Sequence, residues 1–489
     1  MQLNNNNLAL LQGVTTPNYD RSQLTAGILH IGLGNFHRAH QAWYLHRLMQ
    51  QGDDLNWAII GAGVRANDSV MRTKLEQQDY LTSLIELDPL SDGVEVVGSM
   101  IDFVPVEAGN GPLIQRMSQA DICIVSLTVT ESGYFIDPAT KEFAAEHVDI
   151  QHDLANPSQP VTCFAAIIQA LRLRRASGLG AFTVMSCDNL LGNGDITKQT
   201  ILSLAQLLDA DLASWIESHV SFPNSMVDCI VPATGPQERR LIQDFGIDDA
   251  VPVTHESYRQ WVIEDNFCAG RPQWQKVGAT ITDDVHAYET MKIRILNGGH
   301  QVIAAAGDLM GIETIAGCMA NPQVGGLFYA VEEEIAPHVA AVPGRTPKAY
   351  IELIAQRFAN AKILDTTRRV AYDGSSRQPG FLLASIKDSL AAGSSASGLA
   401  LVSAIWARYC LGTREDGSII AANDPQWAAL QELAQQAKSN PQMWLENTSI
   451  YGDLAQQDDF ANAFNGWLGL IYSQGVEAAL AEFLLAKVS

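Results

Sequence analysis

Cysteine is scarce in the 489-residue sequence, and its placement excludes several kinds of site. No two of the seven cysteines form a C-x-x-C pair and their number is odd, which is typical of reduced thiols in a cytosolic protein. No cluster of zinc ligands is visible either, so we predict no metal site. The seven residues are Cys123, Cys163, Cys187, Cys229, Cys268, Cys318 and Cys410.

Basic residues are also few: 31 Lys and Arg stand against 54 Asp and Glu, for a net charge of −23. Such a surface repels nucleic acid and anionic lipid, so we expect neither as a partner, although a local basic pocket could still bind an anionic small molecule. Long apolar runs are missing as well, and residues 1–10 lack the basic and apolar segments of a secretory signal. We therefore expect a cytoplasmic protein.

The chain is hydrophobic enough to fold and long enough for two domains, with 47% hydrophobic and 17% charged residues. Its first part alternates apolar runs that end in turn residues with helical patterns, which predicts a parallel α/β sheet covered by helices. The expected strands lie at 27–34, 57–64, 122–130 and 181–187, and the expected helices at 38–51 and 161–176.

After about residue 285 the pattern becomes helical and strand-like runs are rare. The sequence thus predicts an α/β domain over residues 1–284 and a mostly helical domain over residues 285–489. The expected helices lie at 285–310, 322–335, 346–358, 380–391, 397–411, 425–437 and 458–487.

The first expected strand ends in Gly32-Leu33-Gly34-Asn35-Phe36-His37. A strand followed by G-x-G-x-x-G and a helix is the dinucleotide-binding fingerprint of Rossmann domains, in which the backbone approaches a pyrophosphate at the helix N-terminus. The context fits, but His37 replaces the third glycine. We predict that this turn binds a dinucleotide through Gly32, Gly34, Asn35 and Phe36; an ordinary strand–turn–helix connection is the alternative.

The second expected strand should carry the group that reads the adenosine ribose. Asp68 is placed to accept hydrogen bonds from ribose hydroxyls and to repel a 2′-phosphate, which favours NAD. Arg65 could instead attract a 2′-phosphate and so favour NADP. The alternative is that Asn67 or Asp68 merely caps a helix. Asn189, after the fourth strand, could offer an amide donor at the ligand-binding edge of the sheet, and 222–228 has similar turn character.

The segment MKIRILNGGH (291–300) concentrates polar groups in an apolar stretch. At about 100° per residue, Lys292, Asn297 and His300 fall on one side of a helix, Glu289 joins them one turn earlier, and Arg294 points away. A lysine base, an amide for an alkoxide-like oxygen and an imidazole suit proton transfer at a carbinol carbon. A solvated helix face is the alternative.

Together these segments resemble the polyol-specific long-chain dehydrogenases, a family that includes mannitol 2-dehydrogenase and the fructuronate and tagaturonate reductases. The similarity runs from about residue 25 to the C-terminus. The matching segments are HIGLGNFHRAHQ (30–41), SLTVTESGYF (126–135), FTVMSCDNLLGNG (182–194), FPNSMVD (222–228), QWVIEDNF (260–267), MKIRILNGGH (291–300) and RVAYDGSSR (369–377).

The resemblance implies NAD(P)-dependent, metal-independent oxidation of a polyol or reduction of a ketose. In the family, the lysine matching Lys292 is the general base, and the asparagines matching Asn189 and Asn297 hold the reacting oxygen. The histidine matching His300 positions the substrate, and the glutamate matching Glu289 lines a proton path. Members of the family are commonly monomers.

The resemblance also places Asp228 and Glu131 near the nicotinamide and the substrate, and it makes Arg369 and Arg377 contacts for the distant hydroxyls. It favours NAD but leaves NADP open, because Asn67 stands where the mannitol enzyme has Glu. The preferred substrate pair is D-mannitol and D-fructose. Reduction of a hexuronate stays an alternative, since both arginines could hold a carboxylate. A third hypothesis is a protein that binds a nucleotide as a sensor and has no catalytic activity.

Overall fold

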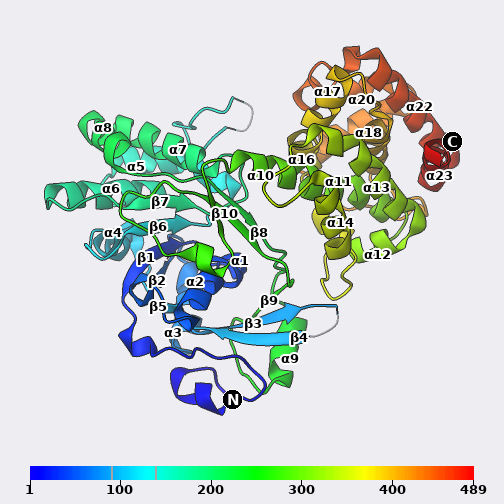
Figure 1. Ribbon diagram of the computed structural model, residues 1–489. Helices are drawn as coiled ribbons and strands as arrows, with labels where there is room; N and C mark the ends of the chain where they lie inside the picture. Colours follow the sequence, from blue (N-terminus) through cyan, green and yellow to red (C-terminus); the bar gives the residue numbers. More distant parts are fainter. Residues whose placement is uncertain (90–91, 138–139, 489) are drawn as a thin grey trace. The chain divides into compact units, whose positions relative to one another are not determined.

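The computed structural model describes residues 1–89, 92–137 and 140–488, which form two compact units, Met1–His286 and Ala287–Ser489. This division falls close to the boundary expected between residues 284 and 285. Each unit has its own architecture: the first contains the strands and the second is built from helices (Figure 1).

A parallel five-stranded sheet forms the centre of the first unit, with the strand order β5-β2-β1-β6-β7. The predicted α/β class is confirmed, and each of the four expected strands is present in shortened form. The edge strand β5 was not predicted, because its sequence MIDF has no continuous apolar run and Asp102 is exposed. The strands are β1 (Ala26–Ile31), β2 (Ala58–Ala62), β5 (Met100–Phe103), β6 (Ile124–Leu127) and β7 (Thr183–Ser186).

Helices cover both faces of this sheet, so its strands are buried on both sides and read as apolar runs. On one face Leu29 belongs to a core that includes Phe164, and on the other Ile28 belongs to a core that includes Leu48. The helices of the unit are α1 (Asn35–Ala39), α2 (Gln41–Gln50), α3 (Asp68–Glu76), α4 (Gly111–Met117), α5 (Val148–Ala155), α6 (Cys163–Ala176), α7 (Asn193–Leu208), α8 (Ala210–His219) and α9 (Pro236–Asp244).

Two three-stranded sheets complete the unit, in the orders β4-β3-β9 and β11-β10-β8. The turn character expected over 222–228 is wrong for its second half, because Ser225–Asp228 is a buried strand antiparallel to β10. Its partner lies more than thirty residues later, beyond the reach of a local pattern. The strands are β3 (Thr82–Leu87), β4 (Asp92–Val97), β8 (Ser225–Asp228), β9 (Val253–His255), β10 (Gln260–Glu264) and β11 (Thr280–Thr282).

The second unit is helical, as predicted, and α11 and α18 are buried along most of their length. The expected helix over 458–487 is two helices, because Gly475 adopts φ +89° and Glu415 accepts a 3.2 Å hydrogen bond from the N–H of Val476. The helices are α10 (His286–Met291), α11 (Gly298–Leu309), α12 (Ile315–Ala320), α13 (Pro322–Ile335), α14 (Pro347–Phe358), α15 (Thr367–Val370), α16 (Gly374–Phe381), α17 (Leu383–Ala391), α18 (Ser397–Tyr409), α19 (Trp427–Ala437), α20 (Gln442–Leu445), α21 (Thr448–Tyr451), α22 (Asp458–Gln474) and α23 (Val476–Val488).

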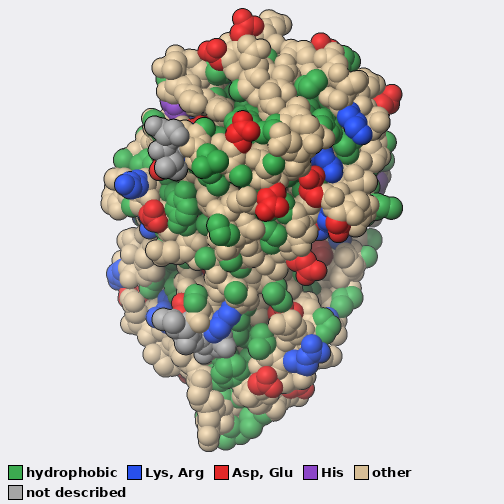
Figure 2. Space-filling model, turned by 90° about the vertical axis from the view of Figure 1, so that its right-hand side faces the viewer, with side chains coloured by type: hydrophobic (Ala, Val, Ile, Leu, Met, Phe, Trp, Pro, Cys, Tyr) green, Lys and Arg blue, Asp and Glu red, His purple; other side chains and the backbone are tan. Residues whose placement is uncertain are grey.

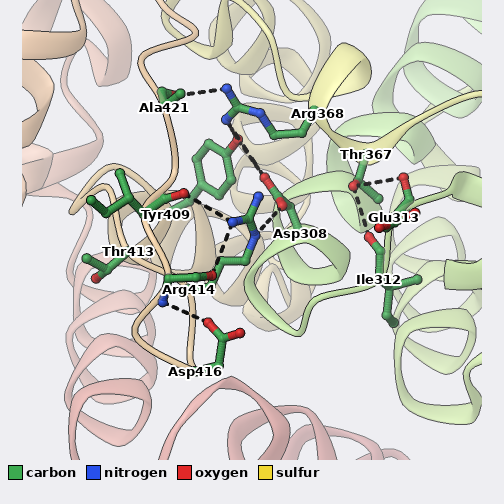
Figure 3. A network of polar contacts seen from close by, with 12 residues as sticks. Asp308, Ile312, Glu313, Thr367, Arg368, Tyr409, Thr413, Arg414, Asp416 and Ala421 are labelled. Atoms are coloured by element: carbon green, nitrogen blue, oxygen red, sulfur yellow. Dashed lines mark hydrogen bonds and ion pairs between the residues drawn. The ribbon is translucent and has the colours of Figure 1, made fainter.

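A polar network fixes the C-terminal end of α11 (Figure 3). The buried carboxylate of Asp308 accepts hydrogen bonds from Arg414 Nε at 2.8 Å and from Tyr409 Oη at 3.0 Å, and Arg368 lies 3.9 Å away. Because buried charges are stable only when paired, this carboxylate ties α11 to α15, to α18 and to the loop that carries Arg414.

No helix in the described part of the chain combines the length and apolar character needed to span a bilayer. On the face shown in Figure 2, acidic and basic side chains are interspersed rather than gathered into one basic patch. Within the same described residues, no three His, Cys, Asp or Glu side chains are grouped so that they could hold a metal ion.

Candidate active site

The turn after β1 contains two glycines with different structural requirements. Gly32 has φ +97°, and a Cβ there would lie 2.1 Å from the carbonyl oxygen of Thr128, so the fold itself requires glycine. Gly34 is the N-cap of α1, and a Cβ there would meet no atom nearer than 4.0 Å. The protein's own packing therefore does not explain Gly34, and the open space beside it suits a backbone that a ligand approaches closely.

His37 stands at the position of the third glycine and packs α1 against β1 through its ring. In the fingerprint that glycine lets the helix approach the strand; here the buried ring of His37 stacks on His30 of β1, with centroids 3.4 Å apart. His30 is held by Ser126 Oγ at 2.8 Å and Thr128 Oγ1 at 2.9 Å. Burial lowers the pKa of His30 to about 3, so the stacked rings are neutral.

The side chains of Asn35 and Phe36, the next two residues predicted to bind the cofactor, contact other residues of the protein. The side chain of Asn35 donates to Thr234 Oγ1 at 2.9 Å and accepts from Arg38 at 2.7 Å. Phe36 stacks on His40, with centroids 4.8 Å apart. The side chains of Asn35 and Phe36 thus stabilise the turn, so these residues can bind a pyrophosphate mainly through their backbone N–H groups.

Asp68 closes the turn after β2. Its Oδ2 accepts a 2.9 Å hydrogen bond from the N–H of Arg65, while Asn67 stands at the N-cap of α3 without a side-chain hydrogen bond. A Cβ at Gly63 would lie 2.3 Å from the Cβ of Asp68, so that glycine makes room for the carboxylate. Asp68 is half-buried and the Arg65 side chain is exposed.

A buried carboxylate that the sequence did not single out, Asp188, joins two predicted site segments. It accepts hydrogen bonds from Tyr134 Oη at 2.6 Å and from the N–H groups of Val129 and Thr130 at 2.9 and 3.0 Å. Burial, opposed by these hydrogen bonds, raises the pKa of Asp188. The carboxylate therefore connects the end of β7 to the segment that precedes Glu131.

Two further predicted residues are exposed to solvent, and a third is buried. Asn189 follows Asp188 and is exposed, and Glu131, also exposed, begins a short 3₁₀ turn (Glu131–Tyr134). Asp228 ends β8 opposite Gln260 and is buried.

In the second unit, Lys292–Asn297 forms a π-helical turn, η7, between α10 and α11. The N–H of Gly298 bonds to the carbonyl of Ile293, five residues earlier. The uniform 100° spacing assumed from the sequence is therefore wrong here, since a π-turn is wider than an α-turn, and such turns are frequent at functional sites.

Three of the polar residues predicted for this helix are buried. Glu289, Lys292 and Asn297 are 4%, 7% and 8% exposed, which excludes a solvated helix face as their explanation. Arg294 has its own ion pair with Asp388 at 2.6 Å.

His300 lies among charged residues of three other segments. Its ring stacks on Phe358 at 4.0 Å, and its Nε2 lies 3.8 Å from Oδ2 of Asp365. Asp365 in turn holds Arg369 by two 2.6 Å hydrogen bonds, and Arg377 donates to the carbonyl of Val370. The unit thus brings the predicted residues His300 and Arg369 together around a carboxylate that sequence analysis missed, and Arg377 bonds to the backbone of the same short helix as Arg369.

Models of two domains match the chain: the mannitol dehydrogenase Rossmann domain over residues 26–276 and the mannitol dehydrogenase C-terminal domain over residues 284–469. Mannitol 2-dehydrogenase of Cereibacter sphaeroides is 53% identical over 478 residues, covering 98% of this chain and 100% of that one. D-mannonate oxidoreductase of Escherichia coli K12 is 39% identical, with coverage of 96% and 98%.

Among solved structures, the Pseudomonas fluorescens mannitol 2-dehydrogenase in ternary complex with NAD and D-mannitol superposes with a TM-score of 0.89. It is 41% identical in sequence, and the match covers 99% of this chain and 100% of that chain. The fold seen here is therefore shared along its whole length with a protein that binds a dinucleotide and a hexitol.

Proposed function

Because the chain belongs to the mannitol dehydrogenase family, we propose that it is an NAD-dependent oxidoreductase that interconverts D-mannitol and D-fructose. The observation that carries the proposal is the 53% identity to a mannitol 2-dehydrogenase over both full lengths. The buried Lys292 and Asn297 on one wide helical turn support it, since burial of such groups has a cost that function explains.

The first unit supplies the residues that would hold the cofactor. The Gly32–Gly34 turn and the start of α1 take the pyrophosphate, and Asp68, with Oδ1 left for a ribose hydroxyl, favours NAD. Arg65 and Glu131 are exposed beside these segments and contribute to the same site. When bound, the nicotinamide accepts or returns the hydride.

The second unit supplies the acid–base group. Lys292 takes the hydroxyl proton as hydride leaves the carbinol carbon, and it returns the proton in ketose reduction. The amides of Asn297 and Asn189 hold the reacting oxygen without adding charge. Glu289 passes the proton onward, and His300 positions the substrate.

Arg369 and Arg377, with Asp228, contact the remaining hydroxyls of the substrate. The hexuronate alternative is kept open by the 39% identity to D-mannonate oxidoreductase, but the polyol is favoured for a structural reason. Arg369 already uses Nε and Nη2, the edge with which arginine grips a carboxylate, on Asp365. We expect small molecules to be the partners of this protein, and we expect a cytoplasmic monomer.

Absorbance at 340 nm tests the proposal directly. Mannitol, arabinitol, sorbitol and mannonate would be oxidised, and fructose, fructuronate and tagaturonate reduced, each with both nicotinamide cofactors. The proposal predicts the highest kcat/KM for mannitol and fructose with NAD(H). Activity confined to the uronates overturns the substrate assignment but keeps the mechanism.

Lys292→Ala separates catalysis from cofactor binding. Loss of the general base should lower kcat by about 10²- to 10⁴-fold, while the fluorescence change on NADH binding stays. Near-normal turnover in this variant contradicts the role of Lys292. A wild-type protein that binds NADH yet turns over none of these substrates favours instead a nucleotide sensor or a substrate outside this set.

A further inference from the structure

Asp365 is a buried carboxylate that the mechanism above does not use. It lies in the loop between α14 and α15, where its backbone carbonyl accepts a 2.9 Å hydrogen bond from Ile315 and the neighbouring Thr366 pairs with Thr314. Arg369 grips it with Nε on Oδ1 and Nη2 on Oδ2, both at 2.6 Å. Backbone and arginine together fix the direction in which the two oxygens point.

One of those oxygens faces His300. Oδ2 lies 3.8 Å from Nε2, which is too far for a formed hydrogen bond but within the range of a strong charge–dipole interaction. Nε2 is buried and has no hydrogen-bond partner among the described residues. The stack on Phe358, with centroids 4.0 Å apart and an angle of 12° between the rings, holds the imidazole in its plane.

The ring itself is neutral. Burial, the largest cause, lowers the pKa of His300 to about 4, and the positive charges of Arg369, Arg357 and Arg377 act in the same direction. Asp365 is the charged group that opposes them. A neutral imidazole carries one proton, either on Nδ1 or on Nε2.

The carboxylate decides between these two forms. A lone pair on Nε2 directed at Oδ2 is repelled, whereas an N–H directed at it is attracted, and the difference is large because the pair is withdrawn from water. We propose that Asp365 is a positioning residue that fixes His300 as the Nε2–H tautomer, so that Nδ1 accepts a hydrogen bond from a substrate hydroxyl. This inference rests on the function proposed above.

The tautomer restricts which substrate atom His300 can bind. A ketone or carboxylate oxygen has no proton to donate, so it finds no partner in the Nδ1 lone pair. The donors for the reacting oxygen are Lys292 and the amides instead. His300 then recognises a hydroxyl that neighbours the reacting carbon, and the enzyme selects substrates that carry one there.

Nitrogen NMR tests the tautomer without any turnover. Full-length protein labelled with ¹⁵N-histidine would be examined near pH 7.5, with and without NADH, and the His300 signals identified by their loss in His300→Gln. Long-range ¹H–¹⁵N correlations should show the proton of His300 on Nε2 in the wild type and a shift toward Nδ1 in Asp365→Asn. A wild-type Nδ1–H pattern overturns the proposal.

Kinetic measurements then test whether His300 binds a substrate hydroxyl. Asp365→Asn should lower kcat/KM for mannitol by about tenfold or more, but by less than about threefold for a deoxy analogue that lacks the neighbouring hydroxyl. Equal losses on both substrates indicate a merely structural role and overturn the proposal. The matched control is Asp388→Asn, which breaks the 2.6 Å ion pair with Arg294 in the same unit and should leave the tautomer unchanged.

The two experiments test the proposed function and the tautomer of His300 separately. Failure of the wild type to oxidise mannitol contradicts the proposed function, whereas the NMR result still decides whether Asp365 sets the tautomer.

Discussion

The backbone N–H of Thr130 donates a 3.0 Å hydrogen bond to Oδ1 of Asp188, which lies 58 residues later in the sequence. Thr130 has φ +69° and ψ 160°, a conformation that is almost restricted to glycine and costs a β-branched residue about 1–3 kcal/mol. The strain persists because the carboxylate holds the backbone in place, and it occurs directly before Glu131, which is predicted to contribute to the cofactor site.

Replacing Asp188 by Asn should release this turn. An amide has one oxygen, so it cannot accept from Val129, Thr130 and Tyr134 together, and a lost hydrogen bond to a buried charged group costs about 1.5–3 kcal/mol. We expect a lower urea midpoint and weaker NADH binding. Thr130→Gly removes the strain, so Asp188→Asn should cost clearly less in that background; equal costs in both backgrounds refute the coupling.

Gly32 and Gly34 should respond differently to the same substitution. Gly32→Ala places a methyl group 2.1 Å from a carbonyl oxygen at positive φ and should lower the melting temperature strongly or prevent folding. Gly34→Ala meets nothing within the protein, so the melting temperature should stay near that of the wild type, while the Kd for NADH rises at least about tenfold. Unchanged NADH affinity in Gly34→Ala would remove this turn from the cofactor site.

Cofactor preference should depend on the charge of Asp68. Asp68→Asn keeps an acceptor for the N–H of Arg65 but removes the negative charge that repels a 2′-phosphate. The ratio of kcat/KM for NAD over NADP should fall by about tenfold or more, equivalent to about 1.4 kcal/mol. Asn67→Ala, beside it and without a side-chain cap, is the control and should leave the ratio unchanged.

Glu332 on α13 should make the stability of the protein pH-dependent. Neither of its carboxylate oxygens has a hydrogen-bond partner among the described residues, and burial raises its pKa well above the usual value. A raised folded-state pKa contributes stability that is complete below the unfolded value of about 4.3 and is lost as pH rises toward the folded value.

Glu332→Gln removes this titration. Compared with the wild type, the free energy of unfolding of the variant should therefore improve by about 1.4 kcal/mol for each pH unit between the two pKa values. Urea titrations of both proteins at pH 5, 6 and 7 measure the difference. A pH-independent difference would mean that Glu332 is ionised in the fold.

Sequence reasoning found the features that a few consecutive residues encode. The apolar run of β1, followed by the turn at Gly32 and Gly34, is one example. The catalytic roles of Lys292, Asn297 and His300, inferred from another short stretch, stay predictions. Sequence reasoning missed features that depend on distant partners: β8, which pairs with β10, and Asp188, whose carboxylate binds a loop near residue 130. The spacing of Asp365 and Arg369, four apart, was a visible signal, but any helical ion pair shares it.

The π-turn at Lys292–Asn297 also changes the helical phase between α10 and α11. Each α-helical residue advances by about 100°, so a turn that holds one residue more rotates everything after it by about that angle relative to everything before. In an uninterrupted α-helix, Lys292 and His300 would point about 80° apart, and the π-turn shifts that angle by about the advance of one residue. A chain that lost one residue between Lys292 and His300 would keep both side chains in its sequence, yet direct His300 to different neighbours.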